Sequence, residues 1–222
     1  MGDLSAQVGN LVALLPILVV IATALVLLIV DILPVSQQRK HLVVSVLAVS
    51  GVFIAGISLV TTFPYEPARL LGGSLAYDGF TALVGLTVLV VLLMSVAVSP
   101  SFLRRMRIDG LEYYFLLFAS AAGMMILPAA RDLISIIVSI EVISIPLYVL
   151  AAYNRNLSES KEAGFKYFIL GAFASSFLIY GAAFIYGSTG SLWLSGIEAN
   201  LLLLEENWVL LLGLGFLLVG FA

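Results

Sequence analysis

The chain has no cysteine, one histidine, and few charged residues. Without cysteine, it can hold no thiolate-bound zinc, iron–sulfur cluster or disulfide, and it has no cysteine nucleophile. The single histidine, His41, lies beside Arg39 and Lys40 in a polar segment, so this chain alone cannot supply two histidine ligands to a haem. We therefore expect any redox cofactor that works with this protein to be bound by other chains.

Charge is scarce, and apolar residues are abundant. Only 10% of the 222 residues are charged and 62% are hydrophobic, whereas a soluble domain averages roughly 25% charged and 45–50% apolar residues. The mean hydropathy is +1.18. So few polar groups cannot cover a surface in water, and no run of basic residues suggests binding to nucleic acid. The composition excludes a soluble enzyme and predicts an integral membrane protein.

Long apolar runs follow one another along the chain, separated by segments rich in proline, glycine and charge. A helical span needs about 20 apolar residues, and the runs do not alternate apolar and polar residues as barrel strands do. The sequence therefore predicts an all-α, polytopic transmembrane bundle of about seven helices. We place the spans at residues 11–30, 42–62, 79–98, 111–127, 133–152, 163–186 and 208–222.

The basic residues are unevenly distributed among the connecting segments, and positive residues are retained on the cytoplasmic side of a membrane. Few of them lie in the second and fourth connections, which hold only Arg69 and Arg131. We therefore expect the odd-numbered connections to be cytoplasmic and the N-terminus to lie outside the cell. The first, third and fifth connections hold Arg39, Lys40, Arg104, Arg105, Arg107, Arg155 and Lys161.

Small and acidic residues mark two further features. In the sixth span, Gly164, Gly171 and Ser175 would let helices approach closely, although glycine is also simply common in membrane helices. At the starts of the third and fifth spans, Asp78 and Asp132 are suited to capping helix N-termini. Arg131, beside Asp132, is expected at the membrane interface.

Glu141 is the ionisable residue that the sequence places deepest in a span. It follows residue 133 by eight positions, so it lies roughly 12 Å inside the fifth span. A carboxylate near the bilayer centre is costly, and it usually faces the bundle interior or a watery cavity. Because an apolar site penalises the charged form, such a group is suited to taking up and releasing protons. The alternative is a protonated or hydrogen-bonded glutamate with a structural role only.

Lys166 is the second candidate, and it lies only about 5 Å inside the sixth span. It could equally extend to the interface or pair with Glu162 one helical turn earlier. If the fifth and sixth spans are antiparallel neighbours, Glu141 and Lys166 differ by roughly 12 Å in depth. Only water or a further side chain could then link them.

Two stretches carry a specific resemblance to a known family. They are Glu141-Val-Ile-Ser-Ile-Pro-Leu-Tyr148 and Lys166-Tyr-Phe-Ile-Leu-Gly-Ala-Phe-Ala-Ser175. Together with Glu112-Tyr-Tyr-Phe and Ala130-Arg-Asp-Leu, they resemble subunit N of the proton-translocating NADH:quinone oxidoreductase, respiratory complex I. This subunit is called subunit 2 in chloroplast and mitochondrial relatives.

The resemblance implies an antiporter-like fold of two inverted five-helix repeats preceded by extra helices. Residues 1–110 would form three leading helices, and residues 111–222 would begin the first repeat. Glu141 matches the glutamate of the family's proton channel, and Lys166 matches a lysine of the same polar track. Ser144 and Pro146 would shape the site, since the proline ring removes the helical hydrogen bond to the Val142 carbonyl. A kink without function is the alternative for Pro146.

The same resemblance implies partners and a location. The chain would be a non-redox, membrane-arm subunit of the translocase in the plasma or inner membrane, in contact with other membrane-arm subunits and the lipid bilayer. It would contact quinone only indirectly. NAD, FMN, iron–sulfur clusters and quinone would be bound by partner subunits, and no cofactor or metal is expected in this chain.

One departure from the family pattern bears on the mechanism. The family glutamate pairs with a lysine on the seventh helix, whereas this sequence reaches Ala222 about where that lysine is expected. We therefore expect a fragment that cannot pump protons alone. Two alternatives stay open: a structural or assembly subunit of the same complex, and a cation/proton antiporter subunit that shares the same core.

Overall fold

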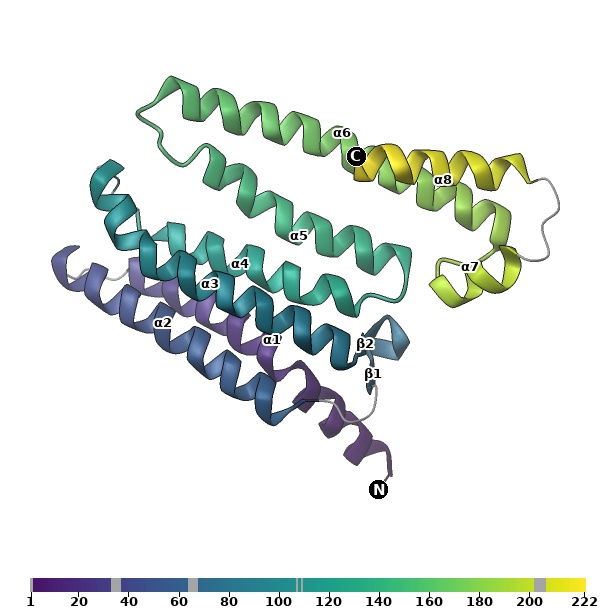
Figure 1. The fold of residues 1–222 in the computed structure, drawn as a ribbon, viewed down its shortest axis with the longest axis horizontal. Coiled ribbons are helices and arrows are strands. Elements are labelled where there is room, and N and C mark those ends of the chain that lie inside the picture. The colour runs from purple at the N-terminus through teal and green to yellow at the C-terminus, as the bar shows by residue number, and fades with distance from the viewer. Residues whose placement is uncertain (1, 33–36, 64–67, 107, 109, 202–206) are drawn as a thin grey trace.

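Long helices that pack side by side form almost the whole molecule (Figure 1). The computed structural model describes residues 2–32, 37–63, 68–106, 108, 110–201 and 207–222. Arg107 and the side chain of Arg39, both counted among the basic residues above, lie outside this described part. The main helices are α1 (Gly2–Ile32), α2 (Gln37–Thr61), α3 (Gly79–Met106), α4 (Glu112–Ile126), α5 (Leu133–Ala151), α6 (Ser158–Thr189) and α8 (Trp208–Phe221), and α7 (Leu194–Leu201) is short.

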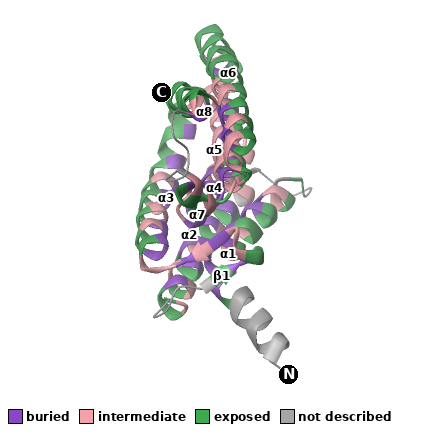
Figure 2. Ribbon diagram, turned by 90° about the vertical axis from the view of Figure 1, so that its right-hand side faces the viewer, coloured by how far each residue is buried: buried purple, intermediate pink, exposed green. Residues whose placement is uncertain are grey.

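The helical membrane bundle predicted from the sequence is confirmed. Within the described ranges, six helices are long and apolar enough to cross a membrane, and α8 is a shorter apolar helix of 14 residues. Large apolar side chains cover much of the outer surface, for example Leu170 on α6 at 68% exposure and Val60 on α2 at 67%. Figure 2 shows exposed residues along the outer faces of these helices. Such a surface is stable only against lipid or apolar partners.

The third helix is longer than predicted. The sequence predicted a span that ends at residue 98, with Pro100 in the connecting segment that follows. In the structure, α3 continues through Pro100 to Met106. Nearby side chains bond to helix carbonyls, with the Ser99 hydroxyl donating to the Ser95 oxygen at 2.6 Å and Arg104 Nε to the Pro100 oxygen at 3.1 Å. Hydrophobicity marks where the apolar part of a span ends, whereas a helix can extend beyond the bilayer.

A small β-hairpin in the second connection was not predicted. Strand β1 (Ala68–Leu70) pairs antiparallel with β2 (Leu75–Tyr77), so that Leu70 lies opposite Leu75. The turn between them includes Gly72 and Gly73 with φ of 69° and 100°, values that favour glycine. These strands are only three residues long, so the alternation that normally reveals a strand cannot develop.

The hairpin is part of a structure we call the loop clasp, which consists of residues 68–78, 128–133 and 191–195. The Arg131 amide donates to the Ser74 carbonyl at 2.9 Å, the Leu133 amide to Leu192 at 3.0 Å, and the Leu194 amide to Arg131 at 3.1 Å. The second, fourth and sixth connections therefore meet at one end of the bundle. This arrangement agrees with the alternation of ends expected from the sequence.

An ion pair strengthens the clasp. Arg131 Nη2 lies 2.7 Å from Asp78 Oδ2, while the Thr81 amide donates to Asp78 Oδ1 at 2.9 Å. Burial alone would raise the pKa of Asp78, but the Thr81 hydrogen bonds and the Arg131 charge outweigh it and hold that pKa below its ordinary value. The predicted N-terminal cap is thus confirmed, and Asp132 caps α5 in the same way by accepting from the Ser135 amide at 2.8 Å.

We expect Asp78→Ala to lower the free energy of unfolding by about 1–2 kcal/mol at neutral pH, since a helix cap and an ion pair are lost together. The folded-state pKa of Asp78 is lowered, so its stabilisation is present at neutral pH and disappears as the pH falls through that value. The difference between wild type and variant should therefore shrink on acidification. Thermal unfolding in detergent at several pH values measures this, with Glu198→Ala on the exposed surface of α7 as control. A difference that does not change with pH would contradict the prediction.

Helix α4 occupies the centre of the packing. Its buried residues Tyr114, Phe118 and Ala122 join the main hydrophobic core with residues of α1, α2 and α3. On its other side, Gly123 lies so close to α5 that an added Cβ would come within 2.8 Å of the Ile143 backbone nitrogen. Helix α4 therefore connects the leading helices to α5, which carries Glu141. The predicted domain boundary at residues 110 and 111, just before α4, stays a prediction.

Candidate functional site

Glu141 lies near the middle of α5. The helix begins under the Asp132 cap and runs to Ala151, so Glu141 is roughly 12 Å from its start and 15 Å from its end. The side chain is partly buried, and its neighbours along the helix are apolar. The sequence prediction of a carboxyl group deep in an apolar span is therefore met by the position of this residue.

The structure brings Ser175 of α6 to Glu141. The Ser175 hydroxyl forms a close hydrogen bond with Glu141 Oε1, and it also lies 3.0 Å from the Gly171 carbonyl oxygen of its own helix. A hydrogen bond between helices satisfies a polar group that lipid cannot solvate. The Glu141 carboxyl group thus has a polar partner between α5 and α6.

Small residues allow α5 and α6 to approach this closely. An added Cβ on Gly164 would collide with Ala152, and one on Gly171 would overlap the Tyr148 hydroxyl. The two helices therefore form an antiparallel contact, along which residue 152 meets 164, 148 meets 171, and 141 meets 175. The prediction that Gly164, Gly171 and Ser175 mark a helix contact is confirmed.

Pro146 and Ser144 lie on α5 next to this contact. Pro146 is buried, and α5 remains one continuous helix from Leu133 to Ala151 around it. Because proline has no amide hydrogen, the Val142 carbonyl lacks its usual helical donor one residue away from Glu141. Ser144 is partly buried, but the hydroxyl that reaches Glu141 is that of Ser175.

Lys166 is not brought to Glu141. Its Nζ lies 2.5 Å from Glu162 Oε1, and the two side chains are 68% and 63% exposed. Lys166 precedes Ser175 by nine residues, which separates them by about 13 Å along the axis and by about half a turn around it. The lysine therefore projects from the α6 face opposite to the Glu141 contact, and the pairing with Glu162 that the sequence left open is the one observed.

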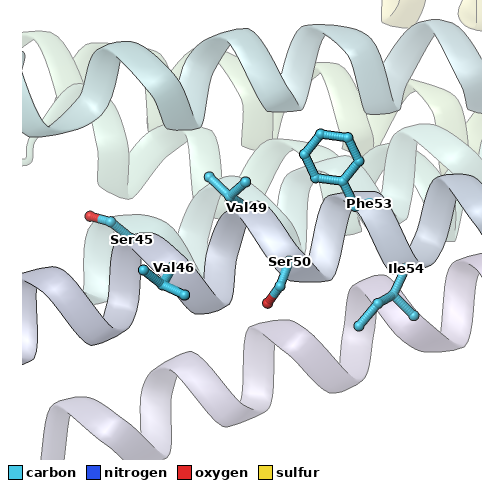
Figure 3. Close-up of a pocket in the computed structure, with 6 residues that line it drawn as sticks. All are labelled: Ser45, Val46, Val49, Ser50, Phe53 and Ile54. Carbon is cyan, nitrogen blue, oxygen red and sulfur yellow. The ribbon is translucent and has the colours of Figure 1, made fainter.

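The groove on α2 does not offer a competing site. The groove shown in Figure 3 lies along α2 and is lined by Ser45, Val46, Val49, Ser50, Phe53 and Ile54. None of these side chains exchanges a proton near neutral pH. Within the residues the structure describes, no cluster of three acidic, histidine or cysteine side chains could hold a metal ion.

Sequence reasoning identified Ser175 only as a small residue suited to helix packing. A signal for its second role was present, because Gly164, Gly171 and Ser175 follow one another at intervals of seven and four residues and so share one helix face. What the sequence could not supply was the register of α5 against α6. Only that register shows which residue of α5 meets the serine.

A family model described as "NADH:quinone oxidoreductase/Mrp antiporter, TM" matches residues 130–222. The chain is 35% identical over 218 residues to NADH-quinone oxidoreductase subunit N of Myxococcus xanthus, covering 97% of this chain and 42% of that protein. It is 33% identical over 217 residues to subunit N of Trichlorobacter lovleyi, covering 97% and 44%. The chain thus spans less than half the length of these relatives.

Solved structures show the same similarity. A chain in respiratory complex I from Thermus thermophilus with bound aureothin matches with a TM-score of 0.73 and 31% identity, over 92% of this chain and 42% of that one. A chain of the membrane-bound sulfane sulfur reductase, an archaeal respiratory membrane complex, matches with a TM-score of 0.67 and 24% identity, over 97% and 44%. The second likeness establishes the fold alone.

Proposed function

This chain belongs to the subunit N family of the NADH-quinone oxidoreductases, and on that premise we propose that it is part of a membrane-arm subunit that couples quinone reduction to proton translocation. The observation that carries the proposal is Glu141, a carboxyl group in the middle of an apolar span that contacts Ser175 of the next helix. Ionisable groups held at that depth are expensive and typically serve ion or proton pathways.

Glu141 would carry the proton. In an apolar surrounding, the protonated form is favoured, whereas a nearby cation or hydrogen-bond donor favours the carboxylate. A change in its partners, driven by quinone reduction in other subunits, would therefore make Glu141 take up or release a proton.

Electron transfer would take place in partner subunits. NAD, FMN, iron–sulfur clusters and quinone would be bound there, and this chain would contact other membrane-arm subunits and the lipid bilayer. The distribution of basic residues supports a cytoplasmic position for the odd-numbered connections. The subunit would then lie in the plasma or inner membrane with its N-terminus outside and with the loop clasp on the outer side.

A cation/proton antiporter subunit is the second candidate, and the family model that matches residues 130–222 covers that class as well. A third reading is a structural or assembly subunit, in which the contact between Glu141 and Ser175 serves packing only. These three candidate functions differ in the subunits that would copurify with the protein and in the ion that would be transported.

Purification by a tag on the full-length subunit tests the proposal. We expect NADH:quinone oxidoreductase activity to copurify, and proteoliposomes of the purified complex to take up protons when given NADH, with or without sodium. Purification without dehydrogenase subunits, together with sodium-dependent proton exchange, would favour the antiporter. Copurification with normal proton uptake after Glu141→Gln would leave a structural role for the glutamate.

Lys166 is the second proposed relay residue, and its pairing with Glu162 allows a matched test. We expect Lys166→Gln to slow proton uptake about tenfold, which is less than the roughly 10²–10⁴-fold contribution of a side chain that transfers a proton in the reaction itself. Glu162→Gln removes the same ion pair but leaves the lysine, so it should retain most of the activity. Equal and small losses in both variants, measured in proteoliposomes, would mean that the two residues form only an exposed pair worth about 0.3–0.5 kcal/mol.

A further inference from the structure

We propose that Ser175 is the positioning residue of the Glu141 proton site, and that its hydroxyl reverses the direction of its hydrogen bond as Glu141 gains and loses a proton. This inference rests on the proposed function, because it requires that Glu141 change its protonation state during turnover. It adds to that function a residue on a second helix with a defined task.

The geometry around Ser175 gives its hydroxyl more than one acceptor. Glu141 Oε1 lies within hydrogen-bond reach, and the Gly171 carbonyl oxygen lies at 3.0 Å. A hydroxyl has one hydrogen to donate and two lone pairs that can accept. It can therefore donate to only one of these oxygens at a time.

The direction of the hydrogen bond between Ser175 and Glu141 differs between the two protonation states of Glu141. When Glu141 is a carboxylate, it can only accept, so the Ser175 hydroxyl donates to it. When Glu141 is protonated, its own hydroxyl can donate to Ser175 Oγ, and the serine hydrogen turns to the Gly171 carbonyl. Both states keep a hydrogen bond between α5 and α6, and no heavy atom has to move.

The helix pair holds Ser175 at this position. Contacts at Gly164 with Ala152 and at Gly171 with Tyr148 set the register and the close approach of the two backbones. Ser175 continues the same face one turn beyond Gly171. A side chain on the neighbouring position points elsewhere, as Ser176 shows: it is exposed and bonds only to the Ala172 carbonyl, at 2.8 Å, among the residues described here.

Ser176 is therefore a matched control. Both serines lie on α6 and both bond to the carbonyl four residues earlier, but only Ser175 reaches Glu141. The variants Ser175→Ala and Ser176→Ala remove the same atom from adjacent positions. Ser175→Thr keeps the hydroxyl, and Ser175→Cys keeps the approximate shape while supplying a much weaker donor.

The experiment uses the complete complex with the full-length subunit. Infrared difference spectra between high and low pH report the carbonyl stretch of a protonated carboxyl group, and the band that Glu141→Gln abolishes belongs to Glu141. Proton uptake per NADH and the turnover rate are measured on the same preparations in proteoliposomes. The infrared band distinguishes hydrogen bonding from a general loss of structure.

We expect Ser175→Ala to shift the Glu141 band to the frequency of a less strongly hydrogen-bonded carboxyl and to slow proton uptake about five- to tenfold. Ser175→Cys should give a smaller change in the same direction, and Ser175→Thr should restore the wild-type band. Ser176→Ala should change neither measurement. If the alanine variant does not assemble, the cysteine and threonine variants make the same comparison.

An unshifted Glu141 band in both the alanine and cysteine variants would overturn the inference, as would equal effects of Ser175→Ala and Ser176→Ala. Failure of the proposed function gives a different result. In that case Glu141→Gln itself leaves proton uptake unchanged, or no pH-dependent carboxyl band is assigned to Glu141. Loss of proton uptake in Glu141→Gln with an unshifted band in the serine variants would overturn only the role of Ser175.

Discussion

Proton uptake by the complete complex should fall roughly tenfold or more when Glu141 is replaced by glutamine, because the amide cannot carry the proton that the carboxyl group exchanges. The substitution preserves the size of the side chain and leaves an acceptor oxygen for Ser175. Assembly should therefore continue, and the loss should be confined to coupled turnover and proton translocation. Measurement of NADH-driven proton uptake beside the yield of intact complex separates these effects.

The matched control for this experiment is Glu159→Gln. Glu159 is exposed in the first turn of α6, and its substitution by glutamine removes the same formal charge. We expect wild-type proton uptake from it. Normal proton uptake in Glu141→Gln would show that this glutamate is structural or redundant. Failure of the complex to assemble in that variant, with normal assembly of the control, would support the packing role instead.

Replacement of Gly123 by leucine should have the largest effect on stability, more than about 3 kcal/mol, because the side chain would be forced into a packed interface. A Cβ at this position would already come within 2.8 Å of the Ile143 nitrogen and 3.1 Å of the Ser139 carbonyl oxygen. These are backbone atoms, so α5 as a whole would have to move away from α4. We expect little folded subunit, measured as the yield of monodisperse protein in detergent.

Gly56 of α2 provides the matched control, since no atom lies within 4 Å of the position of an added Cβ. Gly56→Leu should fold with a yield close to wild type, helped by a gain in helix propensity somewhat below the roughly 0.8–1.0 kcal/mol that separates glycine from alanine. A low yield for Gly56→Leu would mean that leucine in an apolar helix is harmful by itself. A wild-type yield for Gly123→Leu would show that α4 and α5 can separate without cost.

The membrane helices could be predicted from the sequence because lipid imposes a simple condition on them. Each span must be apolar over most of its length and must satisfy its own backbone groups. That condition identified all of the long helices, but it says nothing about segments outside the bilayer. It therefore did not predict the continuation of α3 past Pro100, the hairpin formed by β1 and β2, or helix α7, because all three lie outside the predicted apolar spans.

The candidate site shows a similar division. Glu141 stood out because charge is rare and costly inside a span. Its partner Ser175 did not stand out, since serine is common in membrane helices. Whether such a serine contacts a functional residue depends on the register between the two helices. For Lys166 the sequence left several partners open, and the structure pairs it with Glu162 through a local, exposed contact.

The loop clasp also has a consequence for the order of events during synthesis. Arg131 bonds to Asp78, which is 53 residues earlier, and Leu133 bonds to Leu192, which emerges from the ribosome much later. At roughly 5–20 residues per second, several seconds separate the synthesis of these partners. The clasp can close only after α6 has crossed the membrane and residue 192 has reached the same side as the hairpin. Its closure therefore marks the moment at which the first six helices have all been inserted.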